Sequence, residues 1–79
     1  MDKGEIQFEI SRHIGVLGSA RGGWTTELNL VSWNGREPKL DLRPWDPSHQ
    51  RMGKGIALSA EEAKALHEVL GHYLSTTTN

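Results

Sequence analysis

The residues of this chain that are best suited to chemistry are tryptophans and cations that alternate between residues 33 and 58. This stretch contains two of the three tryptophans, Trp33 and Trp45. It also contains five of the nine lysines and arginines, namely Arg36, Lys39, Arg43, Arg51 and Lys54. Indole rings can stack on nucleobases, and neighbouring cations can neutralise phosphates. The combination is typical of a surface that binds single-stranded nucleic acid.

The histidines and carboxylates make a weaker case for catalysis. His67, Glu68 and His72 imitate a zinc-protease motif, but a spacing of five residues turns the two histidines about 140° apart on a helix. Asp41 is better interpreted as an ion-pair partner within a strand, and Asp46 as a turn residue, than as an acid–base pair. The chain has no cysteine nucleophile. We therefore expect no enzyme activity, no metal and no cofactor.

Length and composition indicate one domain that spans residues 1–79, with flexible ends at 1–5 and 75–79. No apolar run resembles a signal peptide or a membrane span, so we expect a cytoplasmic protein. The net charge of −1 argues against a generally basic nucleic-acid binder. Residues 21–58, however, carry six bases against four acids, so the positive charge lies near the tryptophans.

Alternating apolar and polar residues predict four strands, at residues 6–17, 24–33, 39–45 and 56–58. Arg12 interrupts the apolar face of the first strand, which predicts a bulge there. Asn34-Gly35 predicts a tight turn after the second strand. The inward face should carry Leu28, Leu30, Leu40, Leu42, Ile56 and Leu58. The outward face should carry Glu27, Asn29, Val31, Trp33, Lys39, Asp41, Arg43 and Trp45.

For three sets of residues, the sequence is consistent with two different positions of the side chain. Trp33 and Trp45 are either core residues or exposed, and their outward parity favours exposure. Lys39 and Arg43 are equally consistent with a binding surface and with a solvated face paired to Asp41. Strict alternation would turn Lys54 inward, whereas a bulge at its two flanking glycines would return it to the outer face.

A helix is predicted from Ser59 to about Leu74. Ser59 and Glu62 have the spacing of a capping box. An apolar stripe follows, made of Ala63, Leu66, Leu70 and Tyr73. The fold class is therefore α+β, a curved four-stranded antiparallel sheet followed by one helix that packs on its back. Because one helix covers little of such a sheet, we expect a homodimer.

Two sequence runs carry a family resemblance, D-L-R-x-W at 41–45 and G-K-G-I-x-L at 53–58. With the capping serine and acidic pair, they resemble the single-stranded DNA-binding family of the transcriptional coactivator positive cofactor four. The chain is most similar to its small bacterial, YdbC-type members, from about residue 6 to residue 74. The resemblance implies a homodimer that binds single-stranded DNA with little sequence specificity, in transcription or DNA maintenance.

The resemblance places stacking aromatics at Trp33 and Trp45, and basic contacts at Arg36, Arg43 and Lys54. Lys39 lies beside these contacts, with a looser match to the family pattern. Single-stranded RNA is an alternative ligand, because stacking does not distinguish the sugars. A module that binds proteins of the transcription machinery is a second alternative, since aromatic and arginine side chains are also typical of protein interfaces.

Overall fold

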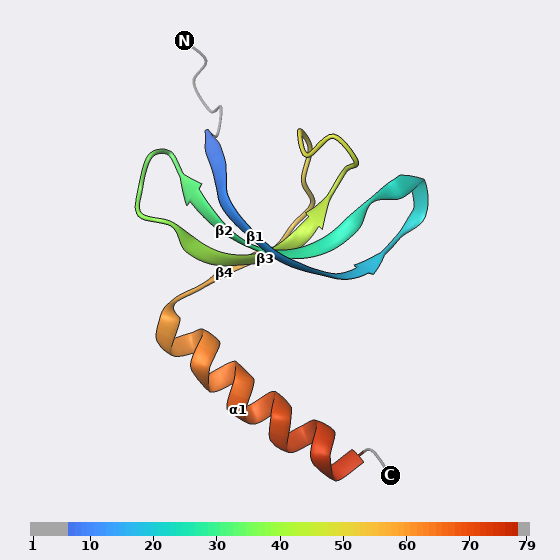
Figure 1. Cartoon of the computed structure of the whole chain (residues 1–79), viewed down its shortest axis with the longest axis vertical. Helices are drawn as coiled ribbons and strands as arrows, with labels where there is room; N and C mark the ends of the chain where they lie inside the picture. Colours follow the sequence, from blue (N-terminus) through green and yellow to red (C-terminus); the bar gives the residue numbers. More distant parts are fainter. Residues whose placement is uncertain (1–6, 78–79) are drawn as a thin grey trace.

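The structure, a computed structural model, describes residues 7–77 of the chain. Four strands form one antiparallel sheet in the order β1-β2-β3-β4, and a single helix follows them (Figure 1). The strands are β1 (Phe8–Ser19), β2 (Thr25–Trp33), β3 (Lys39–Trp45) and β4 (Ile56–Leu58), and the helix is α1 (Ala60–Thr77). A short 3-10 turn, Arg21–Gly23, joins β1 to β2. The predicted α+β class, a four-stranded antiparallel sheet followed by one helix, is confirmed. Ile6, where the first strand was expected to begin, lies outside the described residues.

The predicted tight turn between β2 and β3 is confirmed. Asn34 and Gly35 both have positive φ, 53° and 76°, as a turn that matches the twist of a hairpin requires. The Asn34 side chain also accepts a hydrogen bond from the backbone N–H of Gln7 at 3.0 Å. This bond ties the turn to the start of β1.

β1 is bulged more often than its sequence suggested. Its pairing with β2 shifts register between Ile10 and Arg12, between His13 and Gly15, and between Val16 and Gly18. The first of these is the bulge that Arg12 predicted. Bulges bend a strand and increase its twist, so β1 forces the sheet to curl into the U-shaped profile of Figure 1.

The curl brings opposite ends of the sheet together across its hollow side. Phe8 pairs with Trp33, at one end of β2, and Trp45 pairs with Thr25, at the other end. Eight residues of flat strand would separate the two ends by roughly 26 Å. The Phe8 and Trp45 ring centroids are nevertheless 5.1 Å apart. The aromatic side chains therefore close a compact core inside the U.

We call the two sides of the sheet the concave face and the convex face. The concave face carries Phe8, Ile10, His13, Val16, Thr25, Glu27, Asn29, Val31, Trp33, Lys39, Asp41, Arg43 and Trp45. The convex face carries Leu28, Leu30, Leu40, Leu42, Ile56 and Leu58. The two sets of β2 and β3 residues were separated correctly by alternation.

The burial of the two faces is opposite to the prediction. Glu27, Asn29 and Val31 were expected to face outward, but all three are buried on the concave face. The convex leucines were expected to form the core, yet they are only half-buried, and Ile56 is exposed. The physical reason is the curl, because residues inside a U cover one another while those outside it spread apart.

The capping box at the start of α1 is confirmed. The Ser59 N–H donates to the Glu62 carboxylate at 2.9 Å, and the Glu62 N–H donates to the Ser59 hydroxyl at 3.0 Å. α1 continues to Thr77, so the frayed tail expected from Ser75 is helical as far as the structure describes it. No helix within residues 7–77 is long and apolar enough to cross a membrane.

The prediction that the helix packs on the back of the sheet is wrong for a single chain. α1 leaves the convex side and points away from the sheet (Figure 1), and none of its described residues is buried. The expected burial fails because α1 follows β4 with almost no connection, which gives it no length in which to turn back. Its apolar stripe is consequently exposed along Leu66, Val69, Leu70 and Tyr73.

Candidate nucleic-acid interface

An aromatic cluster of Phe8, Trp33 and Trp45 lies on the concave face. Phe8 contacts both tryptophans, with ring centroids 6.1 Å from Trp33 and 5.1 Å from Trp45. Phe8 and Trp33 are half-buried, so parts of both rings stay accessible. The two predicted stacking residues thus share one face and one cluster.

The expected exposure of Trp45 is wrong, because its relative accessibility is 0%. The curl places Phe8 against it from one side. The loop between β3 and β4 places His49 against it from another, with ring centroids 5.7 Å apart and planes 27° apart. The alternation of residues along β3 correctly placed Trp45 on the face opposite the leucines. It could not show that the sheet curls toward this face and buries the side chain.

Arg43 is held by an ion pair within its own strand, as one of the two interpretations anticipated. Its Nε lies 2.6 Å from Asp41 Oδ1 and its Nη2 lies 2.8 Å from Oδ2, so the pair is bidentate. Asp41 is fully buried and the Arg43 side chain is 15% exposed. The guanidinium carbon lies 4.8 Å from the centroid of Trp33. Arg43 therefore links the Asp41 carboxylate to the more accessible indole.

Arg36, Lys39 and Lys54 are exposed, and within residues 7–77 their side chains make no hydrogen bond or ion pair. Lys39 pairs with Val31 and hence lies on the concave face. Arg36 follows the Asn34-Gly35 turn, and its backbone N–H donates to the Trp33 carbonyl at 3.0 Å. These free cations are available to a polyanion in a way that the engaged guanidinium of Arg43 is not.

The glycines around Lys54 form the bulge that their spacing suggested. Between the Trp45–Met52 bridge and the Leu42–Ile56 pair, β3 advances by three residues while the opposite segment advances by four. Because the Gly53 N–H donates to the Pro44 carbonyl, Lys54 and Gly55 together stand opposite the single residue Arg43. Gly55 packs so closely on Arg43 and Leu42 that a Cβ there would overlap both.

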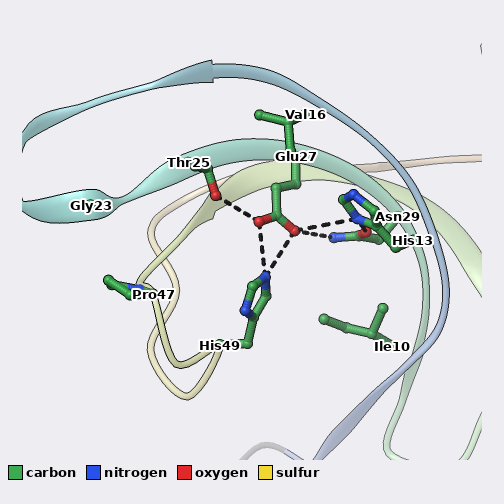
Figure 2. Close-up of a pocket in the computed structure, with 9 residues that line it drawn as sticks. All are labelled: Ile10, His13, Val16, Gly23, Thr25, Glu27, Asn29, Pro47 and His49. Carbon is green, nitrogen blue, oxygen red and sulfur yellow. Dashed lines mark hydrogen bonds and ion pairs between the residues drawn. The ribbon is translucent and has the colours of Figure 1, made fainter.

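A second polar cluster, centred on Glu27, lies on the concave face (Figure 2). Glu27 is 3% exposed, and its carboxylate accepts hydrogen bonds from Thr25 at 2.6 Å and from Asn29 at 3.2 Å. His49 Nε2 lies 3.1 Å from Oε1 and 2.9 Å from Oε2, and it must carry a proton because a carboxylate only accepts. His13 Nδ1 lies 2.7 Å from Asn29 Oδ1.

These hydrogen bonds keep Glu27 ionised. Burial alone would raise the pKa of Glu27, but the hydrogen bonds from Thr25, Asn29 and His49 outweigh it and lower the pKa below its ordinary value. The cluster faces a pocket of about 520 Å³ that also includes Ile10, Val16 and Pro47. Within residues 7–77, no group of three or more acidic or histidine side chains is arranged to hold a metal ion.

The loop that carries His49 is anchored by Asp46, as its interpretation as a turn residue predicted. The Asp46 Oδ1 accepts hydrogen bonds from the backbone N–H groups of Gln50 and Arg51, both at 2.8 Å. The bond from Arg51 is the main cause of the lowered pKa of Asp46. The anchored loop holds His49 over Trp45.

Three residues of this face were missed by the sequence analysis as site candidates, namely Phe8, Glu27 and His49. Phe8 belongs to the apolar alternation of the first strand, and its contact with Trp33 depends on the register between β1 and β2. Glu27 was assigned to the solvent. The one available signal was its position between Thr25 and Asn29 on the same strand face, because all three side chains can form hydrogen bonds. No local signal marked His49, because its role depends on a loop that returns over the sheet.

The sheet is curled, and its concave face carries the clustered aromatic side chains together with Lys39. A family model described as Transcriptional Coactivator p15 (PC4) matches residues 20–69, which include β2, β3, β4 and the first half of α1. The chain belongs to this PC4 family. An uncharacterized protein of Treponema pallidum (strain Nichols) is 41% identical over 66 residues, which cover 84% of this chain and 78% of that protein. The predicted family resemblance is thus confirmed, and a bacterial relative has a similar sequence.

The PC4 match covers Trp33, Trp45 and the free cations Arg36, Lys39 and Lys54. It excludes Phe8, which completes the aromatic cluster from β1. The roles of the individual side chains are still predictions.

Proposed function

We propose that this PC4-family protein binds single-stranded DNA with little sequence specificity, and that it acts by binding rather than by catalysis. The proposal rests on the concave face, where half-buried Trp33 and Phe8 share one surface with the exposed Lys39. Aromatic rings accept the faces of any base, and free cations follow the backbone. A family of transcriptional coactivators is a fitting context for such a ligand.

In this proposal, the six predicted residues have different tasks. Trp33 offers the accessible indole for stacking, and Trp45 supports it from within the cluster. Arg36, Lys39 and Lys54 contact phosphates. Arg43, whose charge is already paired with Asp41, holds Trp33 in place through its guanidinium.

The proposal also includes a homodimer that acts in the cytoplasm, where bacterial DNA lies. The convex leucines and the exposed stripe of α1 are apolar surfaces that a second copy of the chain would cover. Dimerisation would place two concave faces on one assembly, which raises the effective affinity for a long strand.

Intrinsic tryptophan fluorescence titrated with oligo-dT tests this function. We expect quenching and binding that weakens with salt. Trp33→Ala should reduce the affinity by about 1–3 kcal/mol, the usual contribution of one stacked base. Matched RNA and duplex DNA complete the comparison, because RNA binding alone would favour the alternative ligand. Indifference to all three nucleic acids would reject the proposal in favour of a protein-binding module.

A further inference from the structure

His49 makes two contacts that are also used to hold a nucleobase. Its imidazole lies nearly parallel to the Trp45 indole, and its Nε2 donates between the two oxygens of Glu27. Proteins that recognise unpaired bases stack them on aromatic rings and hydrogen-bond their Watson–Crick edges. In Figure 2, the His49 ring enters the pocket from the loop side and points at the Glu27 carboxylate. His49 thus occupies the position of a base.

We infer that Trp45 and Glu27 form a guanine-selective subsite, which His49 fills in the free protein. The inference rests on the proposed binding of single-stranded DNA and adds a base preference at one position of it. Most of the strand would still be bound without selection, because the other contacts are stacking and charge.

The carboxylate geometry selects guanine. Thr25 and Asn29 occupy one lone pair on each oxygen of Glu27, and His49 shares the remaining side of both. Guanine presents two adjacent parallel donors there, N1–H and the 2-amino group, which match a carboxylate in a bidentate manner. Thymine flanks its single N–H with two carbonyl oxygens, and adenine and cytosine place a ring acceptor beside their amino group. Each of these acceptors would be repelled by Glu27.

His49 can leave this position without unfolding its loop. Its side chain is 42% exposed, so a change of rotamer can carry the ring into solvent. The backbone of the loop stays anchored by Asp46. The φ of His49 is +60°, a left-handed backbone conformation that the anchored loop maintains whichever rotamer the side chain adopts.

Fluorescence anisotropy with labelled oligonucleotides tests the inference. The probes are a short oligo-dT, the same strand with one central dG, and the same strand with inosine in place of that dG. We expect the dG strand to bind about tenfold more tightly than oligo-dT, the usual discrimination of one bidentate base contact. Inosine should lose most of this gain, because it keeps N1–H but lacks the 2-amino group.

Two variants and one matched control assign the effect to the subsite. Glu27→Gln should abolish the preference for dG, because an amide presents one acceptor and one donor. Glu37→Gln removes the same charge from an exposed carboxylate beside Arg36 and should keep the preference. His49→Gly, which adopts the positive φ without strain, should bind the dG strand several-fold more tightly than the wild type. This variant decides the matter if Glu27→Gln fails to fold.

Equal affinities for the dG and dT strands in both the wild type and His49→Gly would overturn the subsite. A dG preference that survives in Glu27→Gln would also overturn it. These failures differ from failure of the proposed function, in which oligo-dT does not bind at all. If the dG strand alone binds, the subsite stands and the proposal of binding without sequence preference is wrong.

Discussion

Asp41 engages both of its carboxylate oxygens with Arg43, and this pair determines what Arg43 can do. A guanidinium that donates to a buried carboxylate and lies on an indole has few donors left for a phosphate. Arg36 is exposed and has no such partner among the described residues. At the residue scale, the two arginines therefore differ in role although their charge is the same.

The double variant Asp41→Asn/Arg43→Gln tests this difference. It removes both charges of the ion pair, so no unpaired charge stays buried. DNA binding should weaken by roughly 1 kcal/mol, because Trp33 loses its cation–π contact with the Arg43 guanidinium. The slope of log affinity against log salt should stay unchanged. Arg36→Gln, the control, should reduce that slope by about 0.7, the value for one phosphate contact on a single strand. A similar reduction in the double variant would show that Arg43 contacts phosphate.

At the scale of elements, bulges decide the shape of the sheet. Three register shifts curl β1, and a fourth irregularity at Lys54 offsets the approach to β4. The fourth irregularity depends on the close contact between Gly55 and β3, where a Cβ would overlap Arg43 and the Leu42 carbonyl. The bulge therefore couples the exposed Lys54 to the strand that carries Arg43.

Gly55→Ala should lower the free energy of unfolding by about 1–3 kcal/mol, the usual effect of overpacking at a rigid contact. Urea denaturation followed by tryptophan fluorescence measures the change. Gly15→Ala is the matched control, because a Cβ at Gly15 meets no atom within 4 Å and its φ is not positive. Equal stabilities of the two variants would mean that β4 can move away from β3.

At the scale of the whole molecule, the single chain is open. Its radius of gyration is 14.5 Å, compared with about 12 Å for a compact domain of this length. The excess comes from α1, which extends away from the sheet (Figure 1). The apolar surfaces left exposed on the helix and the convex face are the physical reason to expect a second copy.

Leu70→Lys should convert the proposed dimer to a monomer and lower its thermal stability. A charge in the middle of the apolar stripe cannot be buried against a partner without a large desolvation penalty. Light scattering coupled to size-exclusion chromatography measures the mass. Glu68→Lys places the same residue on the polar side of α1 and should stay dimeric. A wild-type protein that is monomeric at all concentrations would remove the dimer from the proposal.

The sequence by itself determined the features that depend on near neighbours. Alternation separated the two sets of strand residues, Asn34-Gly35 specified the turn, and Ser59 with Glu62 specified the helix start. The glycines around Lys54 marked a bulge for the same reason, since local sterics and hydrogen bonds are complete within a few residues.

Only the tertiary structure decided which strand face is buried and what Trp45 contacts. Both depend on the curl that three bulges of β1 impose together, and on a loop that brings His49 back over the sheet. Such contacts join residues that are distant in sequence, so no local pattern records them. Glu27 shows the consequence most clearly, because a carboxylate assigned to solvent by its parity became the buried centre of a hydrogen-bond network.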